Sequence, residues 1–245
     1  MEAPITLNEL RGFSVNGTDG PIGKIEDFYF DERTWKIRYI VVHTSKLSVV
    51  RDVLVLPQSM ERPSRWTSQL LLNITREQVG KSPDVDTDMP VSRQYEVAVG
   101  RQYGVDVYFS WADGFMGSHN LDLSGYEFPS ITRNKDGKEF DPHLFSIKAV
   151  TGMQINSLDG KAGHVKDFMI DQNAMLIRFL VVEAGNLFVT KKVIVRPLSA
   201  AKIDADGRAI KMNISKVNIL ESPEYDPLAA EPFDERAVTE EKNLP

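Results

Sequence analysis

Hydrophobic and polar residues in the first 86 positions alternate in short runs that are separated by Gly, Pro and Asp. Because side chains alternate between the two faces of a pleated strand, such runs predict short β-strands. Asp19-Gly20 predicts a turn between the first two runs, since Gly accepts a positive φ. Pro57 ends the fourth run, because proline has no N–H for a β-ladder. We expect strands over residues 13–16, 22–31, 35–43, 52–56 and 70–74.

The pattern occurs twice, at an offset of 140 residues. Residues 12–23 match residues 152–163, residues 37–42 match residues 177–182, and 23 of the 77 aligned pairs over residues 10–86 are identical. A repeat of about 80 residues can bury its own core, so we interpret the repeat as a duplicated domain. The predicted domains are residues 5–86 and 146–226, with a connector over residues 87–145 and a tail over residues 227–245.

A short helix is expected to close each repeat. Thr75-Arg-Glu-Gln78 fits a capping box, in which a hydroxyl and an amide satisfy free N–H groups. Ser215 holds the equivalent position, where Asn218 weakens the box. Many short strands with little helix predict a mainly β fold of two small antiparallel barrels, because closure removes exposed edges.

Composition is that of an ordinary globular protein, with 42% hydrophobic and 26% charged residues. The absence of cysteine excludes disulfides and thiolate metal sites. No apolar run approaches the roughly 20 residues that span a bilayer, and we expect a cytoplasmic protein. The net charge of −6 is mostly a tail property, since residues 224–245 hold seven acidic and two basic side chains.

The connector is unusually aromatic, with 10 of the 22 aromatic residues of the chain between residues 87 and 145. Flexible linkers are poor in aromatic residues. One interpretation is that the connector packs on the barrels. The other is that it presents a surface to a partner protein or a second copy of the chain, because aromatic residues are enriched at interface cores. The residues of that candidate surface are Tyr103, Tyr108, Phe109, Trp111 and Phe115.

The recurring glycines and aspartates are candidates for chemical sites. The glycines lack the spacing of a phosphate-binding loop, so turn and bulge geometry is the preferred interpretation. Asp27, Asp31, Asp167 and Asp171 recur without a His or Lys partner, which favours turn capping over acid–base chemistry. The residues assigned to structural turns are Asp19, Gly20, Gly23, Asp159, Gly160 and Gly163.

The four histidines occupy unrelated positions. His43 aligns with Glu183 and His164 aligns with Lys24, so neither position requires imidazole in both repeats. We therefore expect no metal, no cofactor and no catalytic residue. An acidic chain without a basic stripe also argues against a nucleic-acid ligand.

The first copy of the duplicated motif reads Asp19-Gly20-x-x-Gly23-x-Ile25-x-Asp27-Phe28-x-x-Asp31, and the second reads Asp159-Gly160-x-x-Gly163-x-Val165-x-Asp167-Phe168-x-x-Asp171. This motif resembles the PRC-barrel family, which is named after the cytoplasmic domain of the photosynthetic reaction-centre H subunit and is related to the barrel of a ribosome maturation factor. The resemblance covers both repeats.

The resemblance implies a non-catalytic module for protein interaction or assembly, whose partner is another protein or a second copy. Two alternatives stay open. One is a cytoplasmic accessory that docks peripherally on a photosynthetic or electron-transport membrane complex. The other is a ligand binder or enzyme at a cleft between the barrels.

Overall fold

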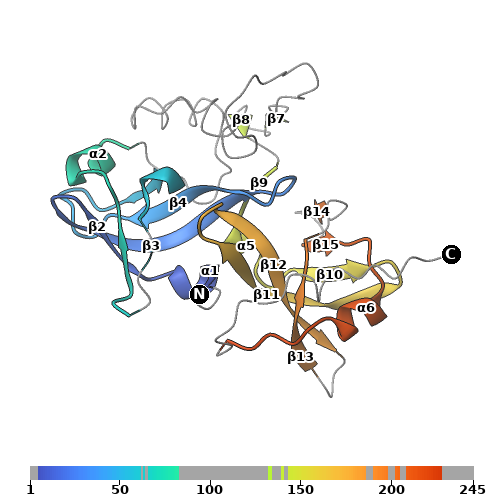
Figure 1. Ribbon diagram of the computed structural model, residues 1–245. Helices are drawn as coiled ribbons and strands as arrows, with labels where there is room; N and C mark the ends of the chain where they lie inside the picture. Colours follow the sequence, from blue (N-terminus) through green and yellow to red (C-terminus); the bar gives the residue numbers. More distant parts are fainter. Residues whose placement is uncertain are drawn as a thin grey trace, which may run out of the picture. The chain divides into compact units, whose positions relative to one another are not determined.

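The computed structural model describes residues 5–61, 63, 66–82, 132–133, 139–140, 143–185, 190–197, 202–204 and 208–227, and β-strands dominate them (Figure 1). The prediction of a mainly β fold is confirmed. The chain forms two compact units that interleave in sequence. The N-terminal unit comprises residues 10–31 and 37–146, and the C-terminal unit comprises residues 1–9, 32–36 and 147–245.

The N-terminal unit contains a six-stranded sheet in the order β5-β4-β3-β2-β6, with β9 as a further partner of β3. The small two-stranded sheet β7-β8 and helix α2 also belong to this unit. The elements are β2 Ser14–Gly17, β3 Gly20–Asp31, β4 Ile37–His43, β5 Asp52–Val55, the 3-10 turn η1 Pro57–Ser59, β6 Gln69–Leu71, α2 Arg76–Gly80, β7 Thr132–Arg133, β8 Glu139–Phe140 and β9 Leu144–Ser146.

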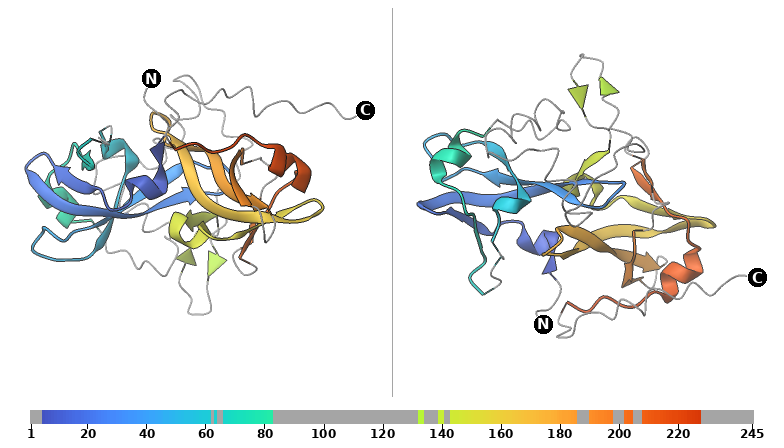
Figure 2. Two further views of the ribbon diagram at one scale, coloured as in Figure 1. Left: turned by 90° about the horizontal axis from the view of Figure 1, so that it is seen from below. Right: turned by 45° about the horizontal axis from the view of Figure 1, so that its top comes forward.

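The C-terminal unit contains a seven-stranded sheet in the order β13-β12-β11-β10-β15-β14, with β1 as a further partner of β11. In both views of Figure 2, β11 and β12 run side by side, as β3 and β4 do in the other unit. The elements are β1 Ile5–Thr6, α5 Ile147–Val150, β10 Gln154–Ser157, β11 Gly160–Asp171, β12 Leu176–Gly185, β13 Thr190–Val195, β14 Lys202–Asp204, β15 Ala209–Lys211 and α6 Lys216–Glu221. Helix α1 Leu7–Leu10 crosses the division of the chain after Glu9, where the sequence passes from one unit to the other.

Two features of the sheets correct the prediction of antiparallel barrels. Each of the two large sheets contains one parallel pair, β2 with β6 and β10 with β15. The ladders of the described strands also form open sheets and not closed barrels. In the N-terminal unit, Pro57 turns the chain after β5, and a single isolated bridge between Met60 and Leu72 follows. One bridge without a continuous ladder does not close the sheet.

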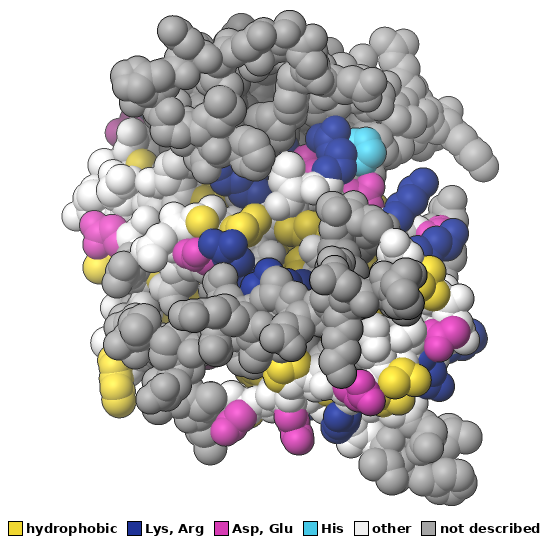
Figure 3. Space-filling model, turned by 45° about the vertical axis from the view of Figure 1, so that its right-hand side comes forward, with side chains coloured by type: hydrophobic (Ala, Val, Ile, Leu, Met, Phe, Trp, Pro, Cys, Tyr) yellow, Lys and Arg dark blue, Asp and Glu magenta, His cyan; other side chains and the backbone are white. Residues whose placement is uncertain are grey.

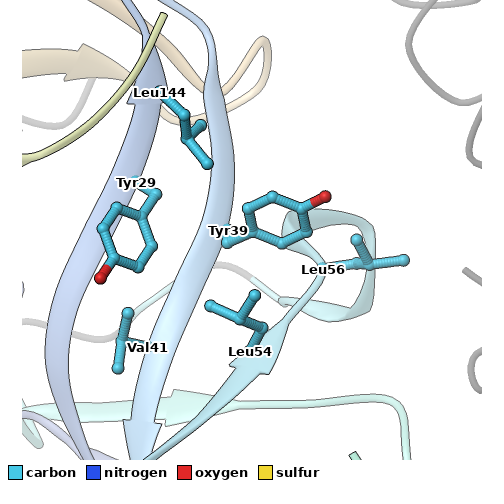
Figure 4. Close-up of a cluster of buried hydrophobic side chains, with 6 residues drawn as sticks. All are labelled: Tyr29, Tyr39, Val41, Leu54, Leu56 and Leu144. Carbon is cyan, nitrogen blue, oxygen red and sulfur yellow. The ribbon is translucent and has the colours of Figure 1, made fainter. Parts of the chain in front are cut away.

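The core lies on the long strands. β3 buries an unbroken run from Asp27 to Asp31, whose three aromatic side chains pack on the pleated surface. One cluster of the N-terminal unit joins β3, β4, β5 and β9 (Figure 4). Its members are Tyr29, Tyr39, Val41, Leu54, Leu56 and Leu144. The C-terminal unit repeats this cluster at the offset of 140, with Met169, Phe179, Val181 and Ile194.

The two repeats also share unusual backbone conformations at equivalent positions. Trp35 and Met175 are 140 positions apart, and both have a positive φ, of 58° and 48°. Ser68 and Arg208 form a second such pair, at 51° and 46°. Bulky residues rarely adopt this conformation, so its occurrence at equivalent positions supports a common origin of the two repeats.

Helix α2 begins at the predicted capping box. The Thr75 hydroxyl accepts a hydrogen bond from the Gln78 N–H at 3.2 Å, and the Gln78 side chain accepts one from the Thr75 N–H at 2.8 Å. In α6, the Ser215 hydroxyl accepts a hydrogen bond from the Asn218 N–H at 3.2 Å.

We predict that Thr75→Ala lowers the free energy of unfolding by about 1 kcal/mol, because the Gln78 N–H loses its acceptor. Urea denaturation measures the loss. Thr75→Ser keeps the hydroxyl and serves as the control. An equal loss in both variants would contradict the capping role.

No helix among the described residues is long and apolar enough to cross a membrane. Most of the aromatic connector lies outside the described residues, so its expected packing on the barrels stays a prediction.

Candidate functional site

Each sheet is completed by a strand from the other repeat. β9, which leads into the second repeat, pairs antiparallel with the end of β3, and Ser146 lies opposite Tyr29. β1, at the start of the first repeat, pairs antiparallel with the end of β11, and Thr6 lies opposite Met169. These pairings are equivalent at the offset of 140. The repeats have therefore exchanged their first strands, and we call β1 and β9 the exchanged strands.

A recurring buried aspartate holds each exchanged strand. The Ser146 hydroxyl donates a hydrogen bond to Asp27, and the Thr6 side chain lies beside Asp167 and lowers its pKa. The Asn8 N–H also donates to Asp167, at 3.1 Å. Asp27 is 5% exposed, so an unsatisfied carboxylate there would be costly.

Strand irregularities bring these aspartates to the exchanged strands. The register of β3 shifts between Ile25 and Asp27, and that of β11 shifts between Val165 and Asp167. Both aspartates therefore lie inside long strands, beside a bulge, and the interpretation of turn capping is wrong for them. It is right for Asp171, whose carboxylate accepts hydrogen bonds from the N–H groups of Asn173 and Ala174.

Burial raises the pKa of Asp167, although hydrogen bonds from Phe168, Asn8 and Thr6 oppose that effect. Between its ordinary pKa of 3.8 and the raised value, the folded protein holds a proton that the unfolded chain has lost. The free energy of unfolding therefore falls as pH rises through this window.

Asp167→Asn cannot ionise, so we predict a flatter pH dependence of stability for this variant in the same window. Urea denaturation from about pH 2 to about pH 7 measures it and also covers the range in which a carboxyl with a lowered pKa titrates. Asp159→Asn is the control, because the hydrogen bond from the Lys216 N–H lowers the pKa of the exposed Asp159 carboxyl. Ionised Asp159 therefore stabilises the fold, and this contribution to the free energy of unfolding is lost as pH falls, which is the opposite sign to that of Asp167. Parallel curves for wild type and Asp167→Asn would contradict the assignment.

The predicted turn aspartates connect each hairpin to a helix. Asp19 follows β2 and accepts a hydrogen bond from the Arg76 N–H at 2.7 Å, at the start of α2. Asp159 accepts the equivalent bond from Lys216 at 2.6 Å, at the start of α6. The neighbouring Gly20 and Gly160 have φ values of 134° and 129°, which suit glycine.

Gly23 and Gly163 serve a different purpose from the turn glycines. A Cβ atom at Gly23 would lie 1.8 Å from the His43 carbonyl oxygen, and one at Gly163 would lie 2.2 Å from the Glu183 carbonyl oxygen. Each glycine therefore permits the close approach of the neighbouring strand.

One histidine of the described residues has an acidic partner on the adjacent strand. His43 Nδ1 lies 2.7 Å from Asp52 Oδ1, and the two residues are opposite each other on β4 and β5. The second repeat has Glu183 opposite Lys192 at these positions. The two repeats thus place different polar pairs at these positions, and imidazole is not common to both. Within the part of the chain that the structure describes, no group of three His, Asp or Glu residues could hold a metal ion.

The predicted partner surface, Tyr103 to Phe115, lies outside the described residues. Sequence reasoning missed the exchanged strands, although a signal existed. The offset of 140 extends upstream of residue 10, where Thr6 aligns with Ser146 and Leu7 aligns with Ile147. This stretch is too short to reveal which repeat it completes.

Comparison with known proteins gives one family assignment. Residues 4–77 match the PRC-barrel domain; the match runs from β1 to the first two residues of α2 and includes both Asp19 and Asp27. No curated protein matches the chain. The second β-sheet region, over residues 144–211, lies beyond the family match. The chain therefore contains one PRC-barrel domain, at residues 4–77.

Proposed function

We propose that this protein is a non-catalytic module for protein interaction or assembly, and that its second repeat is a PRC-type domain as well. The single observation that supports the proposal is the exchange of first strands, in which each of the two large sheets pairs with a strand from outside its own repeat. Addition of a strand to a sheet edge is a common mode of protein recognition.

The chemistry of the recurring carboxylates supports a non-catalytic role. Asp27 and Asp167 bind the exchanged strands, and Asp19 and Asp159 accept hydrogen bonds at the starts of the helices. These carboxylates are engaged in structural hydrogen bonds that both repeats share. A catalytic carboxylate must instead reach a substrate proton.

The surface also favours a protein partner over nucleic acid. On the face in Figure 3, acidic and basic side chains of the described residues are interspersed. Nucleic acids favour a basic patch or stripe. Protein interfaces, in contrast, tolerate mixed charge around an apolar centre.

The test is the formation of a defined complex by the full-length chain, either with itself or with a purified partner protein. Sedimentation equilibrium over a range of concentrations measures self-association, and reconstitution from purified components measures the affinity for a partner. We expect a complex of fixed stoichiometry. A chain that stays monomeric and forms no complex with any purified candidate would overturn the proposal.

A matched pair of tryptophan variants tests the connector as the partner surface. Trp111→Ala alters the predicted surface, whereas Trp66→Ala alters a described side chain that is 98% exposed. We expect Trp111→Ala to lower the affinity of the complex and Trp66→Ala to leave it unchanged. Equal affinities in both variants would remove the connector from the interface.

A further inference from the structure

The two places that accept the exchanged strands have the same construction. In the N-terminal unit, residues 29–31 of β3 form three antiparallel pairs with residues 144–146. In the C-terminal unit, residues 169–170 of β11 form two such pairs with residues 5–6. An aspartate lies two positions before the first paired residue in both cases, at Asp27 and Asp167. We call these places the acceptor sites.

Each acceptor site contacts a hydroxyl residue between apolar neighbours. The two segments read Ile5-Thr6-Leu7 and Phe145-Ser146-Ile147. Ile5, Leu7 and Ile147 are almost completely buried, and the Phe145 ring lies 6.4 Å from the Phe30 ring, centroid to centroid. Leu144 adds a buried side chain to the cluster around Tyr29 and Tyr39 (Figure 4). The shared order is apolar, hydroxyl, apolar.

The carboxylate makes the acceptor site selective for the hydroxyl. An ionised carboxylate only accepts hydrogen bonds, and a Ser or Thr hydroxyl supplies a donor without adding charge. An apolar residue at this position would leave a buried carboxylate oxygen without its donor, which costs more than the bond itself contributes. An acidic residue would add a like charge beside the aspartate.

We propose that the two acceptor sites are one repeated binding site for an extended segment with the order apolar, Ser or Thr, apolar, and that one PRC repeat recognises another through this site. The inference rests on the proposed function and deepens it by naming the partner, the first strand of a second PRC repeat. In this chain, the two repeats fill each other's sites. A tethered segment has a high effective concentration, so it competes strongly against any free segment.

The experiment displaces β1 in the full-length chain and offers the site a synthetic peptide. Thr6→Asp places a second carboxylate beside Asp167, and like-charge repulsion expels the strand. A fluorescent peptide that copies residues 3–10 is then titrated, with anisotropy as the measurement. We expect binding to Thr6→Asp, and affinity for the wild-type chain weaker by at least about tenfold, because the wild-type site is filled.

Two further peptides test selectivity and equivalence. The same peptide with Val in place of Thr should bind at least about tenfold more weakly, because the carboxylate loses its donor. A peptide that copies residues 143–150 should bind the same site within about tenfold of the first peptide, because both segments share the hydroxyl and its apolar neighbours. Equal affinity of the Thr and Val peptides would overturn the proposal.

A second variant keeps the test decisive if Thr6→Asp fails to fold. Thr6→Val removes the hydroxyl with little change in volume, and the peptide of residues 3–10 should bind this variant more tightly than it binds wild type. Absence of peptide binding to both variants would overturn the repeated site. Complex formation by the whole chain is measured separately, so the proposed function can fail or stand independently of this result.

Discussion

Replacing Gly23 with alanine is expected to lower the free energy of unfolding by more than about 3 kcal/mol, the upper end of what inserted atoms cost in a packed structure. The new Cβ would lie 1.8 Å from the His43 carbonyl oxygen and 2.8 Å from its carbonyl carbon. These are backbone atoms of the paired strand β4, so no side-chain rotation relieves the clash. The strands must separate where Lys24 pairs with His43.

Urea denaturation measures the effect of Gly23→Ala, and Gly163→Ala should repeat it in the second sheet. The control is Gly80→Ala in α2, where, among the described residues outside the helix, a Leu47 methyl at 3.9 Å is the nearest atom to a new Cβ. Alanine favours a helix over glycine by up to about 1 kcal/mol, so this control should be neutral or stabilising. If Gly23→Ala and Gly80→Ala have the same stability, the close approach of β3 and β4 is not what requires the glycine.

Local signals in the sequence predicted the elements of the fold well. The strand at Ile22 to Asp31 became β3, and the Thr75 box became the start of α2, because alternation and capping depend on neighbours in the chain. The parallel pair of β2 and β6 was not predicted. Its partners are more than 50 positions apart, and nothing in either strand specifies direction.

The exchanged strands were unpredictable for a related reason. An offset of 140 shows that residues 5–6 and 145–146 are equivalent, but equivalence does not say which sheet each segment completes. The recurrence of the aspartates at 27 and 167 is visible in the sequence, but recurrence alone does not identify the groups that they contact. Their actual partners, Ser146 and Thr6, are over 100 positions away in the chain.

Leu144→Ala is expected to lower the free energy of unfolding of the N-terminal unit by about 2 to 5 kcal/mol, the usual range for truncating a buried leucine. Leu144 is 4% exposed and packs with Tyr29, Tyr39 and Leu54 (Figure 4). The alanine leaves a cavity in that cluster. It keeps the backbone that pairs with Asp31, so the loss reports on packing of the exchanged strand β9.

Hydrogen exchange of the β3 and β4 amides, together with urea denaturation, measures the loss where it is expected to act. Leu71→Ala is the matched control, because Leu71 lies on β6 of the same sheet and is 44% exposed; its loss should stay below about 1 kcal/mol.

Position 144 lies far beyond residues 4–77, the extent of the PRC-barrel match. Faster exchange in β3 of Leu144→Ala would therefore mean that this domain needs a strand from outside its own family boundary. Unchanged exchange would mean that residues 4–77 hold the sheet together without β9, and the exchanged strand would then be an attachment to the domain and not a part of it.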